Sequence, residues 1–173
     1  MRLLFTAFCV LAFIAFSSNE VYAVQRHGTK TYSQQPIPQD STIVTIEKPN
    51  PVDAVKTFFK NFHAQDTLAL KEMILPEIML TSMSIKGEQR RINKTKIDGF
   101  LKGIASIPDS ISFEERLIEI SYSSDTQVAT VSTTYEFYYN NLLSHIGTNK
   151  FTLFFIDDKW IIAGIADTRI YGS

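Results

Sequence analysis

Cysteine is almost absent from this chain, which has only Cys9 among its 173 residues. An intrachain disulfide framework is therefore excluded, because each disulfide needs two cysteines. Histidine is scarce as well. The histidines are His27, His63 and His145, and none has the His-x-x-x-His or Glu-x-x-His spacing of a zinc site on a helix. The sequence predicts no metal site and no cofactor.

A surplus of positive charge is also missing. The chain has 17 Lys and Arg residues against 18 Asp and Glu residues, which gives a formal net charge of −1. Nucleic-acid binding depends strongly on contacts between basic side chains and phosphates, so a protein devoted to it usually has a clear basic surplus. The charge balance argues against nucleic acid as a partner.

Long hydrophobic runs are limited to one, at residues 3–16, directly after Arg2. This run is shorter than the roughly 20 residues that a membrane-spanning helix needs. A polar stretch ending in the small residue Ala23 follows, which completes the pattern of a secretory signal peptide. We predict that residues 1–23 are cleaved together with Cys9, and that the mature protein is secreted or periplasmic with no membrane segment.

The mature chain divides into a polar arm and one domain. Residues 24–51 contain four prolines and almost no aromatic side chains, which is typical of a flexible tether. Within this arm, the β-branched residues at 42–46 leave an added edge strand open as an alternative. Residues 52–173 have about the usual size of a single domain.

The domain begins with helical patterns and ends with strand patterns. Val55, Phe58, Phe59 and Phe62 fall on one face of a first helix, and further helices are expected at about 67–73 and 96–105. Strands are expected at about 78–85, 113–122, 127–139, 142–156 and 159–170. This order predicts an α+β fold, in which three helices pack on the concave face of a curved antiparallel sheet.

Several segments resemble a known family. They are Phe-Phe-Lys-Asn-Phe-His-Ala-Gln-Asp at 58–66, Tyr-Glu-Phe-Tyr at 135–138, Ser-His at 144–145 and Asp-Thr-Arg at 167–169. In this element order they resemble the cone-shaped superfamily of nuclear transport factor 2, ketosteroid isomerase and the polyketide-cyclase-like proteins, and small exported bacterial members in particular. The resemblance implies the fold but little about function, because this fold supports enzymes, ligand carriers and interaction domains.

The chain departs from the isomerase at two places that matter for its chemistry. Aligned on the first helix, the isomerase's oxyanion-hole tyrosine falls near Phe58, which has no hydroxyl group. Its catalytic aspartate falls near Ser82, in a segment without a carboxylate. Ketosteroid isomerisation by that mechanism is therefore not expected.

Two tight turns set the expected register of the last strands. A two-residue turn at Asn140-Asn141 places Glu136 opposite His145, and a second turn at Asp157-Asp158 places Asn149 opposite Ala166. Period-two alternation then predicts an inner face that grades from apolar to polar, as in a ligand pocket. The predicted ligand-binding residues are Ser132, Thr134, Asn149, Thr168, Trp160, Phe58 and Phe62. The other face, with Ala129, Val131, Tyr135, Asp167 and Arg169, is expected to pair two copies in a homodimer.

Glu136 and His145 form the candidate catalytic pair. A carboxylate beside an imidazole favours the protonated ring and provides an acid or base near neutral pH. A plain cross-strand polar pair is the alternative. Asp167 and Arg169 are a second polar cluster, suited to clamping a ligand, holding a partner or forming an ion pair at the sheet margin.

Two further groups have stabilising interpretations. His63 and Asp66 lie three residues apart near the end of the first helix, where such pairs commonly cap and solvate a helix. Five basic residues between Lys86 and Lys96 are expected to form a solvated hairpin and helix start.

Three functions follow from these patterns. The first is an exported domain that holds a small, partly apolar molecule in its cone. The second is an enzyme of the lyase, isomerase or hydrolase kind that uses His145 and Glu136. The third is a protein interaction domain that binds through the arm and the outer sheet face.

Overall fold

The computed structural model describes residues 48–172 of the chain. The signal peptide, nearly all of the arm and the alternative strand at 42–46 lie outside these residues and stay predictions. In the part that is described, no helix is long and apolar enough to cross a membrane.

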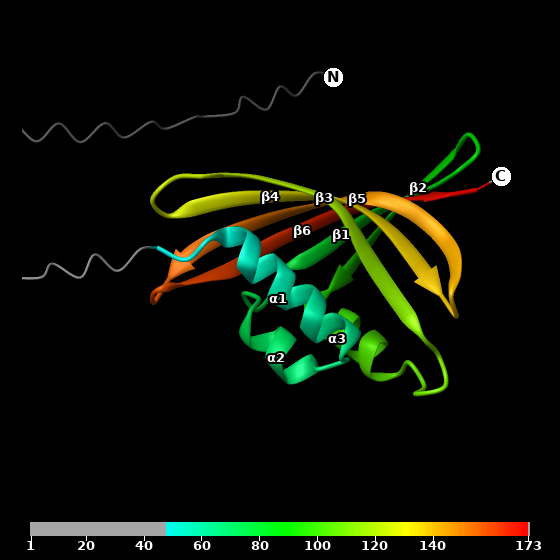
Figure 1. Cartoon of the computed structure of the whole chain (residues 1–173), viewed down its shortest axis with the longest axis horizontal. Helices are drawn as coiled ribbons and strands as arrows, with labels where there is room; N and C mark the ends of the chain where they lie inside the picture. The colour runs from blue at the N-terminus through cyan, green and yellow to red at the C-terminus, as the bar shows by residue number, and fades with distance from the viewer. Residues whose placement is uncertain (1–47, 173) are drawn as a thin grey trace, which may run out of the picture. The chain divides into compact units, whose positions relative to one another are not determined.

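Three helices lie on one side of a sheet (Figure 1). Helix α1 spans Pro51–His63 and begins where the Asn50 side chain accepts a hydrogen bond from the Val52 amide at 2.9 Å. Helix α2, Thr67–Glu72, is capped in the same way by Asp66. Helix α3 spans Ile97–Ala105 and buries its apolar face. The three predicted helices are confirmed.

The sheet has six strands in the order β2-β1-β6-β5-β4-β3. The strands are β1 (Met79–Lys86), β2 (Gln89–Lys96), β3 (Phe113–Ser124), β4 (Val128–Tyr139), β5 (Leu142–Ile156) and β6 (Lys159–Tyr171). All neighbours are antiparallel except β1 and β6, which are parallel. The predicted α+β class is confirmed, and the basic stretch forms the β1–β2 hairpin with β2 fully exposed at the sheet edge.

The hydrophobic core lies between the helices and the sheet. Phe58 and Phe59 of α1 meet Phe151 of β5 with their rings edge-on, at centroid distances of 5.5 and 5.8 Å. Leu153 and Ile162 have no exposed surface. Each such side chain contributes about 1.5–3 kcal/mol by leaving water. The helices are therefore fixed on the sheet mainly at the end of the concave face toward the turn between β5 and β6.

Both predicted hairpin turns form, but a β-bulge follows each. Asn140, Asn141, Asp157 and Asp158 all have positive φ, as two-residue hairpin loops require. Tyr139 then pairs with Leu142 as predicted, but the register shifts by one residue beyond Tyr138. His145 consequently pairs with Phe137, and the predicted pairing of His145 with Glu136 is wrong.

The second bulge lies in β6. Leu153 pairs with Ile162 as predicted, but Thr152 pairs with Gly164, so Ala163 is an extra residue. Beyond it Asn149 pairs with Asp167 instead of the predicted Ala166. Because side chains alternate along a strand, a shift of one residue moves every later side chain to the other face.

The two bulges correct the predicted faces. Ala129, Val131, Tyr135 and Ile165 are buried in the concave side and do not belong to the outer face. The residues next to them in sequence lie on the outer face instead of the predicted inner face; they include Ser132, Thr134, Glu136 and Thr168. The outer face is therefore more polar than predicted, although Ile146, Phe154 and Ile170 remain exposed there. Pairing of two copies through this face stays a prediction.

Candidate functional site

A cavity of about 510 Å³ opens between the helices and the polar end of the concave sheet face. One wall is aromatic. Phe58 and Phe62 of α1 and Phe100 of α3 lie nearly parallel, with ring centroids 6.1–6.3 Å apart. Helical spacing produces this wall, because residues four apart lie on the same helix face. It offers flat apolar surface to whatever occupies the cavity.

The opposite wall is polar and is built from neighbouring strands. Glu115 of β3 accepts a hydrogen bond from the Asn149 side-chain nitrogen of β5 at 2.6 Å. The same nitrogen donates to Thr133 Oγ1 of β4 at 3.1 Å. Thr133 and Asn149 are buried, so this network is held in place by the sheet.

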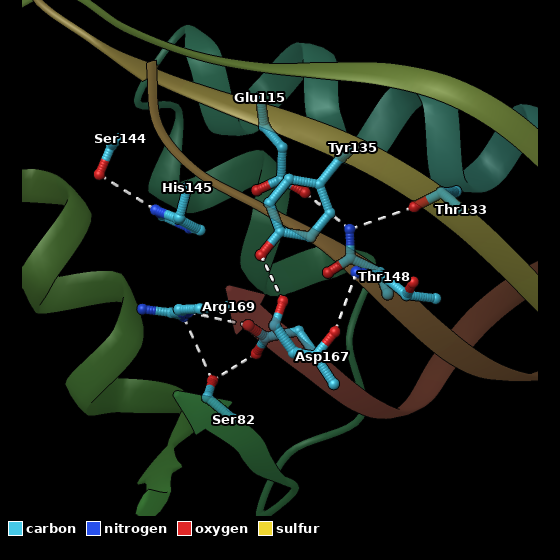
Figure 2. Close-up of polar contacts among 11 residues, drawn as sticks. Ser82, Glu115, Thr133, Tyr135, Ser144, His145, Thr148, Asp167 and Arg169 are labelled. Atoms are coloured by element: carbon cyan, nitrogen blue, oxygen red, sulfur yellow. Dashed lines mark hydrogen bonds and ion pairs between the residues drawn. The ribbon is translucent and has the colours of Figure 1, made fainter. Parts of the chain in front are cut away.

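A second polar group comes from the parallel strands β1 and β6 (Figure 2). The Arg169 Nε donates to Asp167 Oδ2 at 2.8 Å, and its Nη2 donates to Ser82 Oγ at 3.2 Å. Ser82 in turn donates to Asp167 Oδ1. Ser82 pairs with Asp167 in the β1–β6 register, which is why these three side chains share one face. The Asp167 carboxylate therefore has partners on both oxygens.

Tyr135 reaches across the sheet over a glycine. Its hydroxyl donates to the Thr168 carbonyl oxygen at 2.9 Å, and Tyr135 is the cross-strand partner of Gly147. A Cβ at position 147 would lie 2.7 Å from the Tyr135 hydroxyl and within clashing distance of Thr168 O. Burial, together with the charges of Glu115 and Asp167, raises the Tyr135 pKa, so this residue stays a neutral phenol.

His145 is packed among aromatic rings. It stacks on Phe137 at 4.9 Å and lies 5.0 Å from Tyr171, and its Nδ1 is 3.1 Å from Ser144 Oγ. Burial and, to a smaller extent, the positive charge of Arg169 lower its pKa to about 4, and Asp167 acts in the opposite direction. The imidazole is neutral at physiological pH and contributes hydrogen bonding without charge.

The pKa of Glu115 is shifted in the opposite direction, upward. Burial is the main cause that raises its pKa to about 7; the Asn149 hydrogen bond opposes this rise, Asp167 adds to it and Arg169 opposes it. A carboxyl group with a pKa near neutrality is present in both its protonated and ionised forms at pH 7. Glu115 is therefore the group in the cavity best placed to exchange a proton.

The predicted site residues fall into two groups. His145, Asn149, Phe58, Phe62, Asp167 and Arg169 all line the cavity. Glu136 instead accepts a hydrogen bond from the Tyr138 hydroxyl at 2.8 Å on the other face. The candidate catalytic pair of His145 and Glu136 is therefore not formed, because the bulge in β5 separates the two side chains to opposite faces.

The other predicted ligand-binding residues also lie away from the cavity. Ser132 and Thr134 border a separate surface groove, and the Thr168 hydroxyl accepts from the Thr148 amide at 3.1 Å. Trp160 donates to the Pro49 carbonyl oxygen at 2.7 Å and packs against Phe155. Trp160 thus fastens the start of the domain to the far end of the sheet.

His63 and Asp66 have separate structural roles. His63 Nε2 accepts a hydrogen bond from the Glu115 amide at 2.9 Å, and Asp66 caps α2. Burial lowers the His63 pKa, and Glu114 partly opposes this, so the ring suits its role as an acceptor. His63 fixes the backbone of β3 at the residue whose side chain enters the cavity.

Sequence reasoning missed Glu115 and Tyr135 as cavity residues, and it missed Ser82 as a partner of Asp167 and Arg169. Glu115 carried a usable signal, because it stands between Phe113 and Leu117 in the alternation of β3, at a position where an inward residue is expected. Tyr135 was placed on the wrong face by the bulge. Within residues 48–172, no three His, Cys, Asp or Glu side chains gather in a way that would hold a metal ion.

These features define an α+β domain whose helices and curved sheet enclose a cavity with one aromatic and one polar wall. No protein-family model matches the chain, and no curated protein is significantly similar to it in sequence. Solved structures do match. A nuclear transport factor 2-like protein from Cytophaga hutchinsonii aligns with a TM-score of 0.56 and 12% identity over 69% of this chain and 95% of that one.

Two further solved structures match this chain in fold. A nuclear transport factor 2-like protein of unknown function from Pseudomonas putida aligns with a TM-score of 0.54 and 6% identity, over 68% of this chain and 82% of that one. A protein of the same family from Streptomyces avermitilis, whose dehydratase activity is itself a suggestion, aligns with a TM-score of 0.51 and 11% identity, over 70% and 94%. The chain has the nuclear transport factor 2-like fold. These identities show the fold alone.

Proposed function

We propose that this domain binds a small, partly apolar ligand in the cavity between α1, α3 and the sheet. The observation that carries the proposal is the pairing of a stacked phenylalanine wall with a hydrogen-bonded polar wall around about 510 Å³ of space. Pockets of roughly 300–1,000 Å³ with apolar walls and a few convergent polar groups are typical of small-molecule sites.

The two walls would divide the ligand between them. Phe58, Phe62 and Phe100 are suited to its apolar body, because flat rings bury much surface with few rotatable bonds. Glu115 and Asn149 are suited to its polar end, since both lie in the lining and are already oriented by the network from Thr133. Little reorganisation is then needed on binding, which lowers the cost of association.

The test uses a position where the cavity can be filled without disturbing the sheet. Gly103 of α3 lines the cavity, and a Cβ at that position would meet nothing within 4 Å. We expect Gly103→Leu to abolish retention of small molecules in native mass spectrometry of the purified protein, because Gly103 is a lining residue and the added side chain would take up space at the cavity. Gly103→Ala is the matched control, since it makes the same helix-favouring change with far less bulk.

The proposal fails if wild type and Gly103→Ala retain no molecule and neither shows a thermal shift with any compound of a small-molecule panel. It also fails if Gly103→Leu retains the same molecule as the wild type.

A second function, acid-base catalysis in the same cavity, has one observation in its favour. Burial places the pKa of Glu115 near 7, as a residue that takes and returns a proton in a lyase, isomerase or hydrolase requires. Glu115 takes the place of the His145–Glu136 pair, which the strand register separates. If the wild type turns over a retained ligand or its analogues, Glu115→Gln should lower kcat by about 100-fold or more. An unchanged kcat would end this alternative.

The pattern of residues 1–23 supports a location outside the cytoplasm for this binding function. Mass spectrometry of the N-terminus of the protein recovered from its native cell would test it, with Val24 as the expected first residue. An intact Met1 would contradict export by cleavage.

A further inference from the structure

We propose that the ligand of this cavity is an organic cation, an amine with an apolar and preferably aromatic body, whose charge is received by Glu115. This inference rests on the proposed binding function and names the chemical class of its ligand.

The charges that line the cavity are unequal. Glu115 and Asp167 are acidic, Arg169 is the only basic side chain in the lining of the described domain, and no lysine lies there. Arg169 is already engaged, because it forms an ion pair with Asp167 at 2.8 Å. Asp167 also receives the Ser82 hydroxyl. The Asp167–Arg169 pair is therefore close to neutral, which leaves Glu115 without a cation of its own.

The hydrogen bonds around Glu115 lead to the same conclusion. Within residues 48–172, Asn149 is the one side chain that donates to its carboxylate, through Oε1 at 2.6 Å. An amide donor stabilises an ionised carboxylate less than a cation does, and a buried carboxylate without a cation is costly. An ammonium group seated beside Glu115 would supply the missing charge.

The aromatic rings around the cavity favour a cation as well. The cavity is lined by the aromatic rings of Phe58, Phe62, Phe100, Tyr135, Phe137 and Tyr171. Ring faces carry negative electrostatic potential and attract a cation within about 6 Å of the centroid. His145 adds no positive charge to compete, because burial and Arg169 keep its pKa at about 4.

An anionic ligand fits this arrangement poorly. A carboxylate in the cavity would be the third negative group beside a single arginine, and like charges in a low-dielectric site repel strongly. A neutral alcohol avoids the repulsion but supplies no positive charge to pair with the Glu115 carboxylate. The expected order of affinity is therefore amine first, alcohol second and carboxylate last.

Cation binding should also depend on pH. A bound ammonium favours the ionised form of Glu115, so binding near neutral pH releases a proton. Affinity for an amine of high pKa should rise as pH increases from 6 to 8. The other charged and titratable groups that face Glu115 from the packed elements are His63 of α1, Tyr135 of β4, His145 of β5, and Asp167 and Arg169 of β6.

The experiment compares three probes with the same body: 3-phenylpropylamine, 3-phenylpropanol and 3-phenylpropanoate. Isothermal titration of each into the purified protein at pH 6 and pH 8 gives affinities and proton release. We expect the amine to bind about 10-fold or more tightly than the alcohol at pH 8, and to lose affinity at pH 6, since one desolvated charge pair is worth roughly a factor of ten or more.

Two variants separate the role of Glu115 from a general effect of charge. Glu115→Gln keeps the shape and the contact with Asn149, and we expect it to lower amine affinity about 10-fold while alcohol affinity stays within about 3-fold. Glu114→Gln is the matched control, because the adjacent Glu114 is an exposed carboxylate paired with Arg116 at 2.9 Å. It should leave all three affinities unchanged.

The outcomes distinguish this inference from the function on which it rests. If the alcohol binds as tightly as the amine, or if Glu115→Gln keeps full amine affinity, the cation assignment is wrong and the binding cavity stands. If none of the three probes binds and native mass spectrometry finds no retained molecule, the binding function fails and the cation assignment fails with it. If Glu115→Gln does not fold, wild-type amine affinity that is equal at pH 6 and pH 8 overturns the inference.

Discussion

The two ends of the concave sheet face are built from the same strands but do different work. At the end toward the β5–β6 turn, Leu153 and Ile162 have no exposed surface and pack against the helices. At the other end, Glu115, Asn149 and Arg169 line a cavity. One end supplies the hydrophobic stabilisation that lets the other keep polar groups in a partly desolvated space.

The change from one end to the other takes place along single strands. On β5 the inward side chains run from Leu153 and Phe151, which are buried in the core, to Asn149 and then His145 in the cavity. Alternation keeps all four on the same face, so a few steps of two residues separate packing from chemistry. The packed core and the cavity are therefore separated by position along the strand.

The largest effect should come from a cavity made at the packed end. Leu153→Ala removes a fully buried side chain, and we expect it to lower the free energy of unfolding by about 2–5 kcal/mol, measured by urea denaturation. Leu143→Ala on the same strand is the control, because Leu143 is exposed, and its effect should stay within about 0.5 kcal/mol. Equal effects would show that the two ends do not differ in packing.

The next effect tests the close approach of Tyr135 to Gly147 at the cavity end of the sheet. Gly147→Ala places a Cβ against the Tyr135 hydroxyl and the Thr168 carbonyl oxygen, and we expect a loss of about 3 kcal/mol by thermal or urea unfolding. Gly164→Ala is the matched control, since the nearest atom there is at 3.9 Å, an ordinary contact. A destabilisation by Gly164→Ala as large as that by Gly147→Ala would contradict the role of the Tyr135 contact.

The smallest of the stability effects depends on pH. The folded-state pKa of Glu115 is raised from 4.5 to about 7, so the folded state binds more protons than the unfolded state between these values, and stability is lost as pH rises through this window. Glu115→Gln removes that loss. Relative to the wild type, the variant should gain at most about 3 kcal/mol between pH 4.5 and pH 7.

The measurement is urea unfolding of both proteins at several pH values. His145, whose folded-state pKa is lowered from 6.5 to about 4, produces the opposite slope, with stability rising as pH increases from about 4 to 6.5. Because both proteins contain His145, its effect cancels in the difference. A difference between wild type and variant that does not change with pH would mean that Glu115 is not buried as a protonated acid.

The element order and the hairpin turns could be predicted from the sequence because they have local signals. The Asn140-Asn141 and Asp157-Asp158 turns adopt the positive φ that these residue types tolerate. The fold class followed from helical spacing early in the domain and strand alternation late in it. The same alternation also identified Asn149 and His145 as inward residues, and both line the cavity.

The site could be predicted only in part, because the two bulges have no comparable signal. Ser144 and Ala163 are ordinary residues in strand sequence, and nothing in the local sequence marks either of them as the extra residue of a bulge. Without the bulges, the expected register assigned β4 and the later part of β6 to the wrong faces. Glu136 was therefore paired with His145, and Tyr135, Asp167 and Arg169 were expected on the outer face although they line the cavity. Ser144 and Ala163 thus decide which polar side chains form the site.

A crystal structure of the purified protein with 3-phenylpropylamine tests the division between the two ends most directly. We expect the ligand between the phenylalanine wall of Phe58, Phe62 and Phe100 and the Glu115 carboxylate, with the packed end unchanged. A cavity closed by those rings, or a ligand bound only on the outer face, would contradict the assignment of the polar end as the binding site.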